Sequence, residues 1–190
     1  MKVILIGGTP GTGKTSVANL MGGRLGRSVI NLGQVAKDGN CHRDRDDARD
    51  TFVIDEDCLV DAIERIIDEE TSDLIIEGHY IDLVPSRRVE RVFVLRVHPD
   101  ELLERLRERG YPEEKVNENV ESEIFGVCQL DAIDAFGEQK VYEIDASKHT
   151  PRQLADELLK SLQQKEPPQR IDWMIMLEEE GRLEDFLQDE

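Results

Sequence analysis

Eight consecutive residues near the start of the chain have the types and the spacing of a phosphate-binding loop. Gly8 to Thr15, GTPGTGKT, match the pattern G-x-x-x-x-G-K-[ST] in full. The glycines let backbone N–H groups wrap a phosphate, the lysine reaches the β- and γ-phosphates, and the final hydroxyl binds Mg²⁺. A simple glycine turn needs neither Lys14 nor Thr15, so the pattern predicts a site for a nucleoside triphosphate with Mg²⁺. The residues assigned to the phosphates are Gly11, Thr12, Gly13, Lys14, Thr15 and Ser16, and Lys14 is also assigned to catalysis.

A carboxylate and an imidazole follow a later apolar run. The segment LIIEGHY, from Leu74, places Glu77 at the end of a predicted strand and His79 two residues further on. A carboxylate at a strand end beside the loop is where Mg²⁺ needs a ligand, so Glu77 and Thr15 are predicted to hold the metal. His79 could orient a water molecule or relay a proton, or it could cap a backbone carbonyl, and the spacing favours neither.

Two arginines near the middle of the chain could stabilise a transferring phosphoryl group. Arg105 and Arg109 are four residues apart, on one face of a predicted helix that ends at Gly110. Guanidinium groups suit phosphate oxygens on which charge develops, so both are assigned to catalysis and Arg109 also to nucleotide binding. The alternative is that they form solvated ion pairs with neighbouring glutamates. Arg96, at the end of a strand, could act in the same way, or it could form a structural ion pair.

The elements that must position these residues alternate along the chain. Apolar runs at 2–7, 29–32, 74–77, 91–97 and 141–146 predict strands buried on both faces. Helical patterns occupy 14–25, 57–70, 99–110, 112–136 and 150–165. This alternation predicts an α/β fold of the P-loop NTPase class, with five parallel strands, helices on both faces and right-handed crossovers.

Two segments lie outside this alternation. Residues 33–51 are polar and contain HRDRDDARD, which predicts a small lobe or a loop with a solvated surface. The chain is broken at Pro167 and Pro168, and beyond them apolar residues recur at roughly helical spacing around a lone Trp173. We expect this tail to pack on its own core, and a partner-binding or oligomerisation helix is the alternative. The predicted division is a main domain at 1–165 and an acidic, helical tail at 166–190.

The charge of the chain restricts its partners. The net charge is −18, from 42 acidic and 24 basic side chains. Direct binding to nucleic acid is not expected, because it requires lysine and arginine facing the phosphates. The charge could form a solvated surface suited to a salty cytoplasm, as in halophilic archaea, or an acidic face that recruits a basic protein. We favour the first explanation for most of the charge.

The cysteines and the apolar content bear on location. Cys41, Cys58 and Cys128 are an odd number without CxxC spacing, so we expect neither a zinc site nor a disulfide framework. Small or buried residues are the preferred interpretation, with a catalytic thiol as the alternative. No apolar stretch of 18 residues exists, and Met1 leads directly into a predicted strand rather than a signal peptide. A cytoplasmic protein without membrane contact is therefore expected.

Six segments in order resemble the adenylate kinase isoenzyme 6 family, the nuclear-type adenylate kinases and ATPases of eukaryotes and archaea. They are GTPGTGKT, INLG, VIDED, IIEGH, VFVLR and ERLRERGYPEEKVNENVESEIF. The resemblance extends from about Val3 to Lys165, and the last segment is far more specific than the phosphate loop. The chain departs from the family at Glu77, where aspartate is usual, and at Lys37, where arginine is common and contacts phosphate differently.

The resemblance implies an activity and partners. Members of the family interconvert ATP plus AMP with two ADP, hydrolyse ATP, and act in maturation of the small ribosomal subunit by binding a basic platform ribosomal protein. It also implies that Asn31, Gly33 and Lys37 lie on the AMP side, in a lobe at about 33–56. A short lid at about 105–118 follows from the same comparison.

The resemblance also implies roles for the strand-end pair: Glu77 and His79 correspond to the acid and the catalytic histidine of the family. Two other functions stay open beside the kinase. One is an assembly factor whose nucleotide state controls a basic ribosomal protein. The other is a kinase for a different small molecule, such as a sugar acid or shikimate, because such kinases share the loop and the fold.

Overall fold

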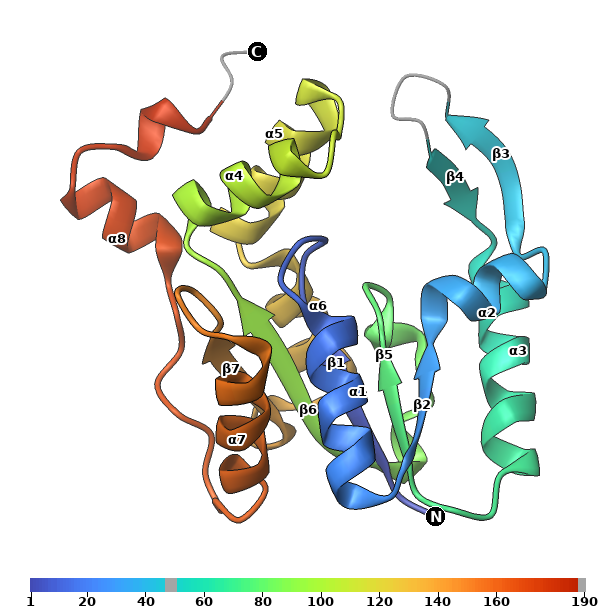
Figure 1. The fold of residues 1–190 in the computed structure, drawn as a ribbon. Coiled ribbons are helices and arrows are strands. Elements are labelled where there is room, and N and C mark those ends of the chain that lie inside the picture. Colours follow the sequence, from blue (N-terminus) through green and yellow to red (C-terminus); the bar gives the residue numbers. More distant parts are fainter. Residues whose placement is uncertain (47–50, 188–190) are drawn as a thin grey trace.

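The centre of the computed structural model, which describes residues 1–46 and 51–187, is a parallel sheet in the order β2-β5-β1-β6-β7 (Figure 1). Its five strands coincide with the five apolar runs, which confirms the predicted fold class. They are β1 (Val3–Gly7), β2 (Ser28–Asn31), β5 (Leu74–Glu77), β6 (Val89–Arg96) and β7 (Val141–Asp145). Because β1 lies between β5 and β6, the residues that follow these three strands meet at one edge of the sheet.

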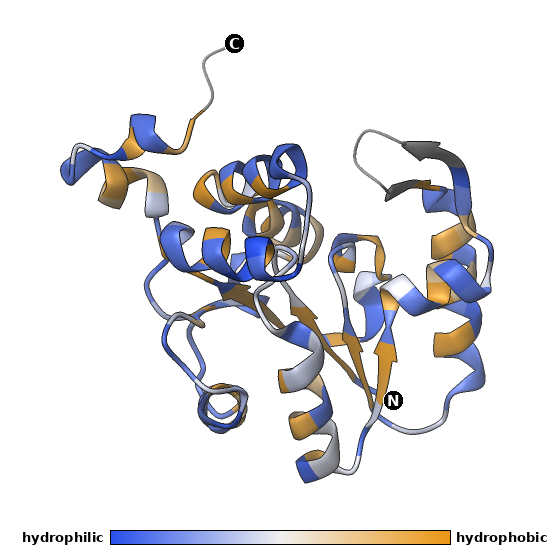
Figure 2. Ribbon diagram, turned by 45° about the horizontal axis from the view of Figure 1, so that its top comes forward, coloured by the Kyte–Doolittle hydropathy of each residue, from blue (hydrophilic) through white to orange (hydrophobic). Residues whose placement is uncertain are grey.

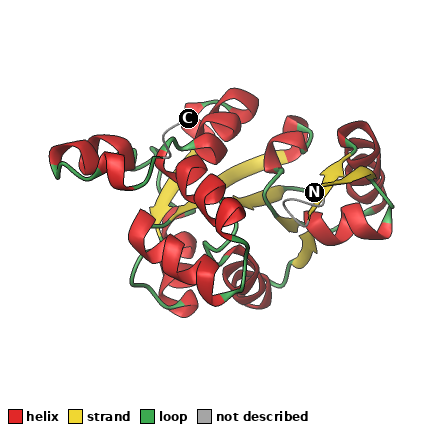
Figure 3. Cartoon of the chain, turned by 90° about the horizontal axis from the view of Figure 1, so that it is seen from above, coloured by secondary structure: helices red, strands yellow, loops and turns green. Residues whose placement is uncertain are grey.

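Helices cover both faces of the sheet, as the view from above shows (Figure 3). On β1, Ile4 and Ile6 pack against one set of helices, and Val3 and Leu5 against the other. This alternation follows from the two-residue period of a strand. The first set is α1 (Lys14–Leu25), α4 (Pro99–Glu108), α5 (Glu113–Ile124) and α7 (Pro151–Ser161). The second is α2 (Leu32–Asp38), α3 (Glu56–Glu69) and α6 (Val127–Phe136). The orange, hydrophobic colour of the sheet strands in Figure 2 marks this two-sided core.

The helical pattern at 112–136 is two helices rather than one. α5 ends with Phe125 as its C-cap, and α6 begins after Gly126, which has a φ of 67°. Glycine adopts this left-handed conformation at little cost, so it allows the chain to turn between the helices. The break separates α5, which packs beside α4, from α6, which packs on the other face of the sheet.

The polar segment at 33–51 contains regular structure that its composition conceals. It holds α2 and most of an antiparallel hairpin of β3 (His42–Asp46) and β4 (Thr51–Ile54). Charged residues occupy β3 almost throughout, so the sequence lacks the apolar alternation that signals a strand. The rest of the run HRDRDDARD, at 47–50, lies outside the described residues.

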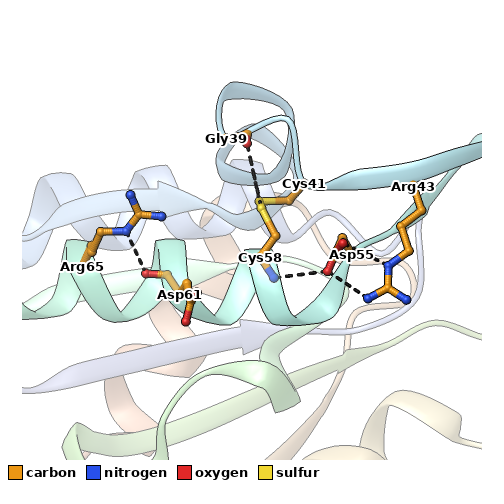
Figure 4. Close-up of a disulfide and its surroundings, with 7 residues drawn as sticks. All are labelled: Gly39, Cys41, Arg43, Asp55, Cys58, Asp61 and Arg65. Carbon is orange, nitrogen blue, oxygen red and sulfur yellow. Dashed lines mark hydrogen bonds and ion pairs between the residues drawn. A yellow bond between two sulfur atoms is a disulfide. The ribbon is translucent and has the colours of Figure 1, made fainter.

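A disulfide in this lobe corrects the expectation drawn from the cysteine count. Cys41 and Cys58 are bonded, with their Cα atoms 5.3 Å apart (Figure 4). The bond joins the segment before β3 to the first turn of α3, and the ion pair of Arg43 with Asp55 lies next to it. Two cysteines 17 residues apart are brought together only by the hairpin between them, which the sequence pattern does not reveal. Cys128 is free and buried.

The tail after the two prolines packs on the core, as expected. α8 (Trp173–Glu179) buries Leu177 in the cluster formed with α4, α5 and α7, and Trp173 is only 7% exposed. The short 3₁₀ turn at Leu183–Asp185 follows, and 188–190 lie outside the described residues. None of the helices that the structure describes is both long enough and apolar enough for a bilayer crossing.

Candidate functional site

The phosphate loop connects β1 to α1 and has a shape that only glycine permits at two of its positions. Gly8 and Gly11 have φ values of 135° and 98°, which side-chain-bearing residues rarely adopt. A Cβ atom on Gly8 would also lie 2.4 Å from the carbonyl oxygen of Leu95, and one on Gly11 would lie 2.9 Å from Leu102. The loop is therefore pressed against β6 and α4.

Lys14 lies at the start of α1 and folds back over this loop. Its Nζ donates hydrogen bonds to the carbonyl oxygens of Gly8, at 2.8 Å, and Thr9, at 3.0 Å. Burial lowers the pKa of Lys14 from its usual value, and nearby acidic groups partly oppose this change. A cleft of about 120 Å³ opens beside it. The residues that line the cleft are Pro10, Gly11, Gly13, Lys14, Thr15, Ser16 and Arg109. A half-buried ammonium beside a helix N-terminus suits a phosphate anion.

Thr15 and Glu77 meet at the edge of the sheet. The Thr15 hydroxyl donates to Oε1 of Glu77 at 2.8 Å, and Asn31 Nδ2 donates to the same oxygen. Glu77 is 1% exposed, yet its carboxylate adjoins the loop. A hydroxyl and a carboxylate are the oxygen ligands that Mg²⁺ prefers. In the described parts of the chain, no three His, Cys, Asp or Glu side chains gather as a metal site.

His79 lies behind the loop, at the end of β5. Its Nδ1 is 3.4 Å from the Cys128 thiol, and its ring meets Tyr80 edge-on with centroids 5.0 Å apart. Burial is the main cause that lowers the pKa of His79, and the positive charge of Lys14 lowers it further. The imidazole is therefore neutral at neutral pH and able to accept a proton. Burial also raises the pKa of Cys128 to about 11, so this residue is a thiol rather than a reactive thiolate.

The two arginines of α4 both adjoin the loop. Arg105 donates to the carbonyl oxygens of Gly11 and Ala146, each at 3.3 Å, and it also forms an ion pair with Glu101, which was the alternative to a catalytic role. Arg109 caps α4 and lines the cleft beside Lys14. Arg96 is different, because it is 1% exposed and paired with Glu123 and Glu143 inside the core. Of its two interpretations, the structural one is correct.

The residues predicted for a second substrate lie on the next element. Asn31 caps α2, where its Oδ1 accepts from the N–H of Gln34 at 2.7 Å, and its amide nitrogen contacts Glu77. Gly33 and Lys37 are exposed on α2. The structure thus joins Asn31 to the Thr15–Glu77 pair and leaves Gly33 and Lys37 at the surface of the lobe.

Sequence reasoning missed a contact behind the loop. The Thr9 hydroxyl donates to Oε2 of Glu123 at 2.6 Å, and both residues are 1% exposed. A signal was present in α5, where Val116, Val120 and Ile124 form a buried stripe that Glu123 interrupts. A charged residue on a buried stripe indicates a polar partner in the core.

A larger cavity of about 830 Å³ lies between α4, α8 and the loop after β7. Asp100, Glu101, Glu104 and Asp145 contribute to its lining. Four carboxylates would repel a triphosphate, so the smaller cleft at Lys14 is the candidate for phosphate binding despite its size.

Comparisons with known proteins show which family and which fold the chain resembles. The family model described as "AAA domain" matches residues 4–126. A relative from Pyrococcus abyssi, named "Putative adenylate kinase", is 36% identical over 159 residues, which are 83% of this chain and 82% of the relative. An "Adenylate kinase isoenzyme 6 homolog" of Caenorhabditis elegans is 35% identical over 155 residues, covering 82% and 84% respectively. The solved shikimate kinase of Bacteroides thetaiotaomicron has a TM-score of 0.57 at 18% identity and covers 86% of this chain and 99% of its own. At that identity it shows a common fold alone.

Proposed function

This chain belongs to the adenylate kinase isoenzyme 6 family and is a nucleotide kinase, and on that premise we propose that it transfers the γ-phosphoryl group of ATP to AMP to form two ADP. The observation that carries the proposal is the grouping of Lys14, Arg109 and the Thr15–Glu77 pair around one glycine loop. Phosphoryl transfer needs little covalent chemistry from a protein, and it depends on such positive and oxygen groups being correctly placed.

The ATP phosphates would lie in the loop from Gly11 to Ser16, against its backbone N–H groups and the start of α1. Lys14 supplies the positive charge, and the phosphates would raise its pKa again from the value that burial depresses. Thr15 and Glu77 would hold Mg²⁺, which when bound neutralises the charge of the β- and γ-phosphate oxygens. AMP would bind next to this cleft, on the side where Asn31, Gly33 and Lys37 lie, since Asn31 contacts Glu77.

The α4–α5 hairpin would act as the lid. Arg105 and Arg109 lie at the end of α4, and Gly110, with a φ of 73°, turns the chain toward α5. Closure of this hairpin would exclude water and bring both guanidinium groups onto the transferring phosphoryl group. In the absence of AMP, a water molecule oriented near the neutral His79 would be the acceptor, and ATP would be hydrolysed slowly.

The rate of ADP formation from ATP, Mg²⁺ and AMP tests this function. Lys14→Ala should abolish turnover with and without AMP, because the ammonium that lines the cleft is lost. Lys160→Ala is the matched control, since Lys160 is exposed on the last turn of α7. Unchanged turnover in Lys14→Ala would contradict the assignment of Lys14 and of the phosphate loop to catalysis. Turnover in the wild type with another small acceptor, and none with AMP, would instead indicate a different small-molecule kinase.

We propose a second role beside catalysis, as the alternative explanation of the charge of the chain. With a net charge of −18, the protein could hold a basic ribosomal protein of the small-subunit platform and release it when ATP is hydrolysed. This cytoplasmic assembly role is compatible with the kinase, because an ATPase can time the release. Recovery of that basic protein on immobilised chain with ATP, and less with ADP, is the expected result. No recovery of that protein in either nucleotide state would contradict this role.

A further inference from the structure

A single buried carboxylate connects three separate parts of the molecule behind the phosphate loop. Oε2 of Glu123, on α5, accepts from the Thr9 hydroxyl in the loop, and Oε1 accepts from Nε of Arg96 at 2.7 Å and from the N–H of Val97 at 3.0 Å. The indole Nε1 of Trp173, in α8, donates to the same Oε1 at 3.2 Å. Three donors thus converge on Oε1 and one on Oε2, so both oxygens of this buried carboxylate have hydrogen-bond partners.

The burial of this cluster makes its geometry restrictive. Glu123 and Arg96 are each 1% exposed, and Trp173 is 7% exposed. Arg96 also contacts Glu143 at 3.0 Å and the carbonyl oxygen of Ile171 at 3.1 Å. A buried ionised group that loses one partner leaves the others unsatisfied, so each partner is held in place by the rest.

Thr9 transmits this geometry to the nucleotide side of the loop. While its hydroxyl binds Glu123, its carbonyl oxygen accepts from Nζ of Lys14 at 3.0 Å and from the hydroxyl of Thr12 at 2.9 Å. A continuous series of hydrogen bonds thus runs from Trp173 through Glu123 and Thr9 to Lys14. No other tryptophan is present in the chain.

We propose that Glu123 is a positioning residue for the phosphate loop, and that the C-terminal segment from Ile171 to Leu177 is part of the nucleotide site through Trp173. The tail then stabilises the conformation of the ATP-binding loop. The inference rests on the proposed function in one respect, since it assumes that the loop binds ATP. It adds Glu123, which contacts the loop through Thr9, and Trp173, which is connected to the loop through Glu123.

The test compares variants of the donors rather than of Glu123, whose replacement could unfold the core. Thr9→Val removes the hydroxyl at nearly constant shape and should weaken ATP·Mg²⁺ binding about tenfold, with Thr9→Ser restoring it to within about twofold. Trp173→Phe keeps the ring and removes the N–H, and it should weaken binding about threefold. The double variant should be weakened about tenfold and not thirtyfold, because both changes break one series of contacts.

Arg182→Gln is the matched control in the tail. Arg182 holds the tail to α4 through Asp100, at 2.8 Å, without touching Glu123. It should leave ATP affinity unchanged, as measured by titration calorimetry on the full chain. In the wild type and in Thr9→Ser, ATP·Mg²⁺ should also change the fluorescence of Trp173, and in Thr9→Val this change should be lost.

The outcomes separate this inference from the proposed function. Suppose that the wild type binds ATP. If the losses of affinity in Thr9→Val and Trp173→Phe then multiply in the double variant, or if Arg182→Gln loses as much affinity as they do, the inference is overturned and the kinase assignment stays intact. A wild-type fluorescence that ATP·Mg²⁺ does not alter, with ATP bound, would overturn it as well. Absence of ATP binding by the wild type would overturn both.

Discussion

Removal of the disulfide in the lobe should loosen the AMP side of the site. The bond between Cys41 and Cys58 closes a segment with a sequence separation of 17 residues. In the loop-entropy account, a closure of this length stabilises the folded state by about 3 kcal/mol. Cys41 is fully buried in the cluster with α2 and α3, so the bond also holds a packed contact.

The effect should be visible in both stability and kinetics. For a chain of this size, about 3 kcal/mol corresponds to a fall in Tm of about 6–12 °C if the lobe unfolds with the rest. Because α2 and the hairpin form the proposed AMP side, the double variant Cys41→Ser/Cys58→Ser should raise KM for AMP and leave the affinity for ATP close to the wild type. The phosphate loop lies on the other side of Glu77 and keeps its own contacts.

The assay is thermal unfolding and steady-state kinetics of the wild type and the double variant, each with and without dithiothreitol. The reductant should shift the wild type toward the variant and leave the variant unchanged, which makes the variant its own control for side effects of the reagent. Equal Tm and equal KM for AMP in all four conditions would refute the reasoning, because the bond would then carry no stability and no influence on the lobe.

Three further changes test individual groups. Glu77→Gln should lower turnover about 10–100-fold and raise the Mg²⁺ concentration needed for half-maximal rate, and an unchanged Mg²⁺ requirement would exclude Glu77 from the metal site. Because burial lowers the pKa of His79 below 6.5, the unfolded chain binds a proton that the folded chain does not, so stability falls as pH drops below about 6.5. His79→Gln should reduce that fall in acid-unfolding curves, and identical curves would contradict it. Arg105→Lys should lower kcat about tenfold, since an ammonium cannot reach both Gly11 and Ala146 as the guanidinium does, and full activity would leave Arg105 a purely structural residue.

The sheet and the phosphate loop could be predicted from sequence because each is encoded locally. The five strands are continuous apolar runs, and the loop is a contiguous pattern between a strand and a helix. Glu77, Arg105 and Arg109 could be placed at the same edge because parallel strands end together. Their positions followed from topology alone, and their roles remain predictions.

What the sequence did not reveal depends on contacts between distant residues or on patterns without apolar alternation. Thr9 and Glu123 are 114 residues apart, and nothing near either residue indicates the other. β3 is charged along its length and lacks apolar alternation, and its pairing with β4 defines it. The disulfide depends on that same hairpin, which brings Cys41 to α3. In each case the missing information was a spatial neighbour.

The most direct measurement of the central claim is the fate of a labelled γ-phosphoryl group. ATP labelled at the γ position is incubated with unlabelled AMP, Mg²⁺ and the wild-type chain, and the products are separated. Direct transfer predicts label in the β position of ADP in amounts equal to the AMP consumed, with little label in inorganic phosphate. Label found only in inorganic phosphate, at a rate that AMP does not change, would contradict the account and leave an ATPase in place of the kinase.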